Sequence, residues 1–369
     1  MNDNQLQHHL ALTMIPHVGD IHIGLLLAHF SDAEEIFRAS RKDLEAVQGI
    51  GSIRANAIRS FSDFGRADAE ISYAGKNKIQ ILVKGNGEYP EKLEQCVDAP
   101  HVLYYQGNAT MNNKKVLSII GTRAPTAYGK ERVAELISVL AAHHVLVVSG
   151  MAYGIDTLAH SEAVKQGLET IGVLGHGLHT IYPFANKSLA TEMRAGGGLL
   201  TEFVQGTAPD KQNFPRRNRI VAGMADAVVV LESGEKGGSL ITAGIANSYN
   251  VDVLAYPGRA LDPLSKGCNM LIRTHRAGLI TSGEELVEYM NWVPKKGLTK
   301  PIQAELFPSL SEDEQRIIAL ISSAGSISID ELIGLSGFRP PMVSSLLFSL
   351  EMHGLISAIP GKLYVLVGR

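Results

Sequence analysis

The sequence predicts an α/β protein built on a doubly wound, mostly parallel sheet, with a helical segment before it and a winged helix after it. Residues 80–292 alternate short apolar runs with stretches of helical spacing, the pattern of repeated β–α units. Residues 5–65 read as short helices, and the chain after residue 310 reads as helices followed by a hairpin. The expected domains are 1–70, 71–293 and 310–369, with 294–309 as a linker.

Two glycine-bearing turns separate apolar helical patterns near the N-terminus. The stronger lies within 47–58 and a weaker one at 15–19. This is the pattern of a helix-hairpin-helix (SAM-like) domain, whose turn can present backbone N–H groups to a DNA phosphate. The same turn also serves simply to pack two helices, and the sequence leaves both interpretations open.

Six apolar runs predict the buried strands of the sheet. Each is short and nearly continuous, as in parallel strands that helices cover on both faces. The segments between them have helical spacing, as in 130–141. The runs are 116–121, 145–149, 170–175, 198–203, 227–232 and 251–256.

The C-terminal part follows the linker, which is rich in proline, lysine and glycine. Ser311 and Glu314 form the spacing of a capping box, which marks the start of a helix. Two more helical patterns begin at Ile327 and Pro341, and 354–367 reads as a hairpin. This order of elements predicts a small winged-helix domain.

The expected recognition helix of this winged helix lacks basic residues. A winged helix that reads DNA needs side chains that reach bases and phosphates from this helix. Residues 342–353 contain no Lys or Arg, and Glu351 is their one certain charge. We therefore expect this domain to pack on the sheet domain or to hold a protein partner.

Composition narrows the possible functions. The formal net charge is −3, so a nucleic-acid partner needs a local basic patch. Cys96 and Cys268 form neither a disulfide framework nor a metal-ligand cluster, which favours a reducing cytosol. The sequence has no signal peptide and no apolar stretch that could span a bilayer. We expect a cytoplasmic protein without a metal or membrane contact.

Residues 214–220 carry the most unusual charge pattern of the chain. Pro215 suits the first position of a helix, where its missing N–H costs nothing. Arg216, Arg217 and Arg219 then lie near the first turn, where the helix dipole disfavours cations by about 0.3–1 kcal/mol each. An anion held by the N–H groups and the guanidinium groups together would resolve this conflict.

For any one of these arginines the alternative is an ion pair with a nearby carboxylate. Glu202, Asp210 and Glu232 are the candidate partners, and we expect at least one of the three arginines to be used in this way. Asn218 and Phe214 add a group that can hydrogen-bond a base edge and a face for stacking. The stretch therefore predicts a site for a phosphodiester chain.

Glycine-rich loops follow several of the predicted strands. In a doubly wound sheet, ligands bind beyond the carboxyl ends of the strands. The loops that begin at Gly121, Ser149, Gly175 and Lys236 are rich in Gly, Ser and Thr, which lets backbone N–H groups approach phosphate oxygens. Tight turns in any α/β protein also need such glycines. None of the loops is a dinucleotide fingerprint or a P-loop, so neither cofactor is supported.

Asp156 and His160 have the spacing of an acid–base pair on one helix. No third residue at a matching spacing completes a metal site, and the sequence has no nucleophile elbow. We expect both residues to brace the structure and expect no catalytic residue.

In its motifs the chain resembles the DNA-processing protein A (DprA/Smf) family. The matching stretches occur in order along the predicted sheet domain, whereas the flanking regions match by position and pattern only. They are 89–93, 119–123, 128–129, 149–156, 159–160, 181–183, 201–203, 214–220, 238–243 and 256–258.

The resemblance implies an extended Rossmann-like domain that binds single-stranded DNA and is not an enzyme. It implies a role in natural transformation and recombination: protecting incoming single strands, helping to displace single-strand-binding protein and loading the RecA recombinase. It also implies a homodimer formed through the Rossmann-like domains, without a cofactor. The DNA contacts that carry over to this sequence are Gly121, Thr122, Arg123, Lys211, Phe214, Arg217, Asn218, Arg219, Gly238 and Ser239.

Two alternatives stay open. A Rossmann-like nucleotide hydrolase of the lysine-decarboxylase-like group uses related loops, although its Pro-Gly-Gly-x-Gly-Thr loop is absent and 236–242 is the nearest segment. A pure scaffold with a vestigial pocket is the other, and it predicts weak, salt-insensitive binding of single strands.

Overall fold

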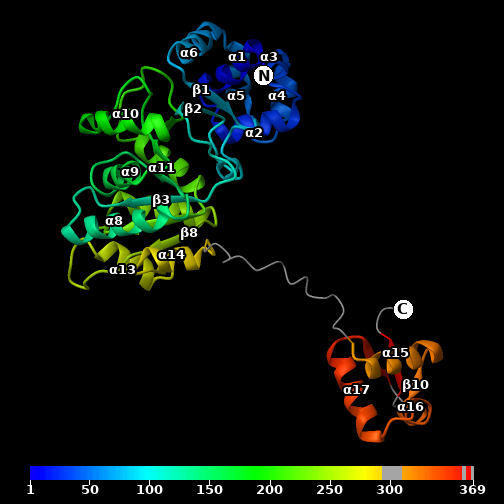
Figure 1. The fold of residues 1–369 in the computed structure, drawn as a ribbon. Helices are drawn as coiled ribbons and strands as arrows, with labels where there is room; N and C mark the ends of the chain where they lie inside the picture. The colour runs from blue at the N-terminus through cyan, green and yellow to red at the C-terminus, as the bar shows by residue number, and fades with distance from the viewer. Residues whose placement is uncertain (293–309, 360–362, 367–369) are drawn as a thin grey trace. The chain divides into compact units, whose positions relative to one another are not determined.

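The fold is seen in a computed structural model that describes residues 1–292, 310–359 and 363–366. The chain divides into two units, Met1–Val293 and Pro294–Arg369 (Figure 1). The described residues of each unit have their own hydrophobic core. The predicted linker, 294–309, lies outside the described residues.

A sheet with the strand order β1-β2-β6-β5-β4-β3-β7-β8-β9 organises the first unit. All strands from β6 to β9 in this order are parallel, and β2 is antiparallel to both β1 and β6. All six predicted strands are present, so the prediction of a doubly wound, mostly parallel sheet is confirmed. The strands are β1 (Gln80–Val83), β2 (Val102–Gly107), β3 (Val116–Gly121), β4 (Leu146–Ser149), β5 (Thr170–Val173), β6 (Gly198–Thr201), β7 (Ala227–Leu231), β8 (Asp252–Ala255) and β9 (Gly278–Leu279).

Helices cover both faces of this sheet. Because side chains alternate along a strand, Leu117 and Ile119 of β3 pack into the core beneath α8, whereas Val116 and Ile120 pack into the core beneath α11 and α12. The helices of the first face are α8 (Ala127–Ala141), α9 (Ile155–Lys165) and α14 (Gly283–Tyr289), and those of the second are α11 (Asn213–Gly223), α12 (Gly238–Ser248) and α13 (Lys266–Arg273). The short α7 (Glu91–Glu94), η1 (Phe184–Asn186) and α10 (Lys187–Gly196) complete this part.

The topology opens a crevice between β3 and β7. The chain adds β4, β5 and β6 on one side of β3 and then crosses to its other side to form β7. The loop after β3 leads to α8 on one face, and the loop after β7 leads to α12 on the opposite face. Such a switch point is where a doubly wound sheet binds its ligand.

Six helices form the N-terminal segment, which lies at the opposite end of the unit from α13 and α14 (Figure 1). Both predicted glycine-bearing turns join helices, and Gly49 adopts a φ of 89° in the stronger one. The expected boundary between residues 70 and 71 falls inside α6, whose Ala67 and Ala74 pack in one core with Leu10 of α1. The helices are α1 (Asp3–Met14), α2 (Asp20–His29), α3 (Ala33–Arg38), α4 (Arg41–Ala46), α5 (Ser52–Ser60) and α6 (Phe64–Lys76).

The second unit has the predicted winged-helix order. Ser311 accepts the N–H of Glu314 and the Glu314 side chain accepts the N–H of Ser311, which confirms the capping box. Ile327 starts strand β10, and the helix expected there begins two residues later. The elements are α15 (Glu312–Ala324), β10 (Ile327–Ser328), α16 (Ile329–Ser336), α17 (Pro340–Met352), β11 (Ile356–Ile359) and β12 (Leu363–Leu366), with the sheet order β10-β12-β11. Residues 360–362 and 367 of the expected hairpin lie outside the described residues.

In the part of the chain that the structure describes, no helix is long and apolar enough to cross a bilayer.

Whether the two units unfold independently of each other can be tested by destabilising one of them. Leu332 is fully buried in the core of the second unit, and replacing a buried leucine by alanine costs about 2–5 kcal/mol. The single tryptophan, Trp292, is buried in the first unit and so reports that unit alone. We predict that Leu332→Ala produces an early unfolding transition by circular dichroism and leaves the transition in tryptophan fluorescence unchanged. A matching shift in fluorescence would show that the units unfold together.

Candidate functional site

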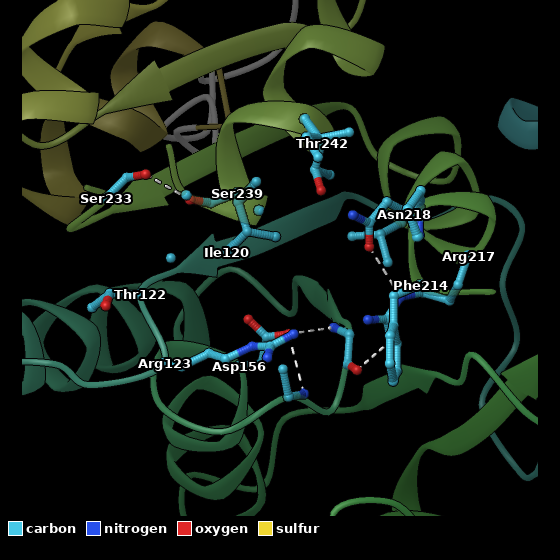
Figure 2. Close-up of a pocket in the computed structure, with 18 of the residues that line it drawn as sticks. Ile120, Thr122, Arg123, Asp156, Phe214, Arg217, Asn218, Ser233, Ser239 and Thr242 are labelled. Atoms are coloured by element: carbon cyan, nitrogen blue, oxygen red, sulfur yellow. Dashed lines mark hydrogen bonds between the residues drawn. The ribbon is translucent and has the colours of Figure 1, made fainter. Parts of the chain in front are cut away.

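A cavity of about 620 Å³ opens at the carboxyl ends of β3 and β7. Figure 2 shows Ser233, Ser239 and Thr242 on one side of it and Asp156, Phe214 and Arg217 on the other. Every predicted site residue except Arg219 lines it. Those residues are Gly121, Thr122, Arg123, Lys211, Phe214, Arg217, Asn218, Gly238 and Ser239.

Two helix N-termini face this cavity. Helix α11 begins at Asn213, so Pro215 is its third residue and not its first, as the sequence suggested. The position still suits proline, because the first N–H groups of a helix have no partner within it. Helix α12 begins at Gly238. Neither helix has a hydrogen bond from an N-cap side chain. At α11 the N–H of Asn213 donates to the carbonyl oxygen of Asp210 at 3.1 Å, so the N–H groups that remain at the two ends can serve a ligand.

Two exposed cations lie at the rim. Arg123 follows β3, and Lys211 lies on the loop before α11. Among the described residues, neither side chain has a carboxylate within ion-pair distance. Their charge therefore stays available to an anion that enters the cavity.

Arg217 is buried beneath the cavity and joins three elements. Its guanidinium donates to the carbonyl oxygens of Gly150 and Val173, and its Nε donates to Oδ1 of Asn218 at 3.2 Å. The guanidinium also lies 5.9 Å from the ring centroid of Phe214. Burial lowers the pKa of Arg217 to about 10, so the group remains charged at neutral pH. Its main contribution is to fix α11 against the ends of β4 and β5.

Asp156 supplies a negative charge close to Arg217. Its carboxylate accepts the backbone N–H groups of Gly150 at 3.1 Å and Ala152 at 3.3 Å. Burial raises the pKa of this carboxyl, while the charge of Arg217 and the two N–H donors oppose the rise. Asp156 thus offsets the buried guanidinium and shapes the loop after β4.

The spacing of Asp156 and His160 does not produce a pair. His160 is fully buried and its Nδ1 lies 2.6 Å from Oγ1 of Thr170. Burial lowers its pKa to about 3, so the ring is neutral. Across the described ranges, no three His, Cys, Asp or Glu side chains gather as metal ligands.

The remaining arginines of the cluster form ion pairs, as expected for at least one of them. Glu202 accepts from Arg216 at 2.9 Å and from Arg219 at 2.6 Å. Arg219 is nearly buried and also pairs with Asp20 of α2 at 3.0 Å. It does not line the cavity, so the structure does not bring this predicted contact to the site. Its position links the N-terminal helices to α11.

The two other candidate carboxylates have different partners. Glu232 adopts a φ of 51° directly after β7 and accepts both the N–H of Thr126, at 2.9 Å, and its hydroxyl. It therefore binds the N-terminus of α8 and not an arginine. Asp210 accepts the N–H of Gln212 at 2.8 Å.

An aromatic pair forms one wall of the cavity. Phe214 is half-buried, and its ring centroid lies 6.1 Å from that of Tyr182, with the planes tilted by 35°. A Cβ on Gly175 would lie 3.0 Å from the Phe214 ring, so a side chain there would press on the ring. Sequence reasoning missed Tyr182 as a site residue, although it lies in the matching stretch 181–183.

The opposite wall carries small polar groups, of which Ser233 and Gly234 were missed, whereas Gly237 and Thr242 belong to the predicted loop that begins at Lys236. Ser233, Gly234, Gly237 and Thr242 line the cavity, and Oγ of Ser233 lies 2.8 Å from Oγ of Ser239. The signal available in the sequence was the position of Ser233 and Gly234 directly after the strand ending at Leu231.

The chain matches the model of the DNA recombination-mediator protein A family over residues 80–291. It also matches a DprA winged helix domain over 303–362 and a helix-hairpin-helix motif over 32–61. It is 30% identical to Protein Smf from Synechocystis over 99% of both chains, and 32% identical to Protein Smf from Escherichia coli over 89% of both.

Two solved structures are similar to this fold. DNA processing protein A from Streptococcus pneumoniae has a TM-score of 0.65 at 30% identity, covering 78% of this chain and 98% of that one. DNA processing protein A from Helicobacter pylori, described for its unique single-stranded DNA binding mode, has a TM-score of 0.53 at 28% identity. That similarity covers 58% of this chain and 96% of the Helicobacter protein.

Glu202 is expected to stabilise α11 through its two arginines. Its side chain is 3% exposed, and breaking a buried ion pair leaves an uncompensated charge. We predict that Glu202→Gln lowers the free energy of unfolding by about 3 kcal/mol in urea titrations followed by Trp292 fluorescence. The exposed Glu192→Gln on α10 is the control and should change it by less than about 0.5 kcal/mol. Equal effects would argue against a structural role for this ion pair.

Proposed function

Since this chain belongs to the DNA recombination-mediator protein A (DprA/Smf) family, we propose that it binds single-stranded DNA in the cavity between β3 and β7. One observation carries this proposal. Two helix N-termini, the ring of Phe214 and the side chains of Arg123 and Lys211, which have no ion-pair partner among the described residues, converge on one cavity. These are groups that bind phosphates and bases together.

The phosphates would interact with the charged side of this cavity. Backbone N–H groups at the start of α11 and α12 and the side chains of Arg123 and Lys211 suit phosphate oxygens. Because Arg216 and Arg219 are already paired with Glu202, they contribute less. Arg217, in turn, holds Phe214 and Asn218 in place, and its charge adds to the field of the cavity.

The bases would meet Phe214, Tyr182 and Asn218. Stacking on an aromatic ring contributes about 1–3 kcal/mol per base and accepts any base. Oδ1 of Asn218 accepts from Arg217, which leaves the amide N–H₂ to donate to a base edge. Sequence-independent binding with a modest preference follows from this arrangement.

Binding suits the cavity better than nucleotide hydrolysis does. The carboxylate of Asp156 is buried and accepts two backbone N–H groups, and Glu232 is held by Thr126. Both carboxylate oxygens of Glu232 and one oxygen of Asp156 are thus already engaged, which supports a protein that binds rather than hydrolyses. Release of a free base from a nucleoside monophosphate by the purified protein would favour the hydrolase instead.

We extend the proposal to the partners that the family resemblance implies. The protein would act in the cytoplasm during transformation and recombination, as a homodimer formed through the sheet domain, without a cofactor. It would protect incoming single strands, help to displace single-strand-binding protein and load RecA. RecA ATPase activity on strands coated with single-strand-binding protein tests the last step: it should rise when this protein is added, and no rise would remove RecA from the proposal. Light scattering tests the dimer.

The phosphate contacts give a measurable salt dependence. We predict that Arg123→Ala/Lys211→Ala weakens binding of a single-stranded oligomer by about tenfold per lost contact at low salt. The slope of log affinity against log salt should fall by about 0.7 for each contact removed. Gel shifts at several salt concentrations measure both quantities.

Lys165→Ala/Arg273→Ala is the matched control for this experiment. Both residues end helices, at the edge of the sheet away from the cavity, and their removal should leave affinity unchanged. Unchanged affinity of the Arg123/Lys211 variant would contradict the site, and weak, salt-insensitive binding by the unaltered protein would favour the vestigial scaffold.

A further inference from the structure

A second hollow lies beside the cavity and shares Arg123 with it. It has a volume of about 390 Å³. The loop before α8, α8 itself, the loop before α9 and the first turn of α9 supply its other lining residues, which are Pro125, Lys130, Tyr153, Gly154, Thr157 and Leu158. None of these six residues has a part in the cavity described above.

Tight backbone packing fixes this hollow next to the cavity. Gly154 adopts a φ of 83°, and a Cβ there would lie 2.2 Å from the carbonyl oxygen of Thr122. The N–H of Ile155 donates to the same oxygen at 3.1 Å. The loop that carries Tyr153 therefore rests directly on the backbone that carries Arg123, so the cavity and the hollow adjoin at Arg123.

The chemistry of the hollow suits a polyanion with flat bases. Tyr153 is 51% exposed, and in the described part of the chain no hydrogen bond ties down its hydroxyl. Lys130 is exposed and has no ion-pair partner within those residues. The acidic neighbour Glu131 pairs with Arg132 at 3.1 Å. An exposed aromatic face thus lies in one hollow with the charges of Lys130 and Arg123, neither of which is paired within the part of the chain that the structure describes.

We propose that this hollow receives the nucleotide next to those in the cavity, with its base stacked on Tyr153 and its phosphate near Lys130. Arg123 would then contact the backbone at the junction of the two sites. This proposal rests on the proposed binding of single-stranded DNA. It adds that the strand leaves the cavity past Arg123 toward Tyr153 and Lys130. The positive charge of the hollow favours an anion over a free apolar ligand, and the exposed ring of Tyr153 next to the cavity favours a stacked base of a continuing DNA strand over an acidic peptide.

A length series separates the hollow from the cavity. The affinity of the full-length protein for oligothymidylates should rise in a step once the oligomer is long enough to reach Tyr153. Tyr153→Ala should remove this step, lowering affinity for long oligomers by about 5-fold to 150-fold, the range for one stacked base. Affinity for the shortest bound oligomers should not change. Tyr153→Phe keeps the ring and should keep the step.

The charge of Lys130 and the position of the base beside Tyr153 can be tested in separate experiments. Lys130→Gln should lower the salt slope by about 0.7 for long oligomers only. Tyr289→Ala is the matched control, because Tyr289 is 55% exposed on α14 and lines neither site. Long oligomers that carry 5-iododeoxyuridine should photocrosslink to Tyr153.

The outcomes distinguish this inference from the function on which it rests. If Phe214→Ala weakens binding of all oligomers while Tyr153→Ala weakens none, the cavity remains the proposed DNA site and the proposed site in the hollow is wrong. If Tyr153→Ala weakens long and short oligomers equally, Tyr153 is part of the cavity and the strand path is wrong. If the unaltered protein binds no oligomer, both proposals fall.

Discussion

The buried guanidinium of Arg217 holds the candidate site together. It bonds the carbonyl oxygens at the ends of β4 and β5 while its own helix, α11, carries Phe214 and Asn218. Burying a charge is expensive unless its hydrogen bonds are complete and an opposite charge is near. The two carbonyls, Asn218 and the carboxylate of Asp156 meet that requirement, and a Cβ on Gly150 would lie 2.7 Å from the guanidinium carbon. A side chain at residue 150 would therefore displace the guanidinium.

The distribution of carboxylates decides which cations stay free. Glu202 is used by Arg216 and Arg219, and Glu232 by the N-terminus of α8. Within the described residues, Arg123 and Lys211 have no carboxylate at ion-pair distance, although Asp156 lines the same cavity and Asp210 precedes Lys211. A protein with a formal net charge of −3 can therefore present a local positive field, to which two helix N-termini add.

The N-terminal helices are tied to the site, whereas the winged helix is a separate unit. Asp20 begins α2, accepts the N–H of His101 at 2.8 Å and pairs with Arg219 on α11. A disturbance of the helical segment can thus reach the helix that carries Phe214. Helix α17 of the winged helix contains no Lys or Arg, and Arg339 is its N-cap residue.

The sequence predicted the parts of the fold that depend on local pattern. Buried parallel strands are apolar along their whole length, so all six runs could be predicted as strands, and the candidate cavity lies at the carboxyl ends of two of them. Pro215 suits the first and the third position of a helix almost equally, so the start of α11 was misjudged by two residues. The start of α16 was misplaced because a two-residue strand at Ile327 and a helical turn have similar patterns.

The sequence alone determined which residue types gather at the edge of the sheet: small residues in the loops, cations and an aromatic ring before α11. Only the tertiary structure decided the partner of each charge. Arg217 faces carbonyl oxygens and Arg219 faces Asp20, a residue far away along the chain. The energy of an ion pair depends on the distance between the two charged groups and on how far solvent screens them. Neither quantity can be predicted from the spacing of the residues along the chain.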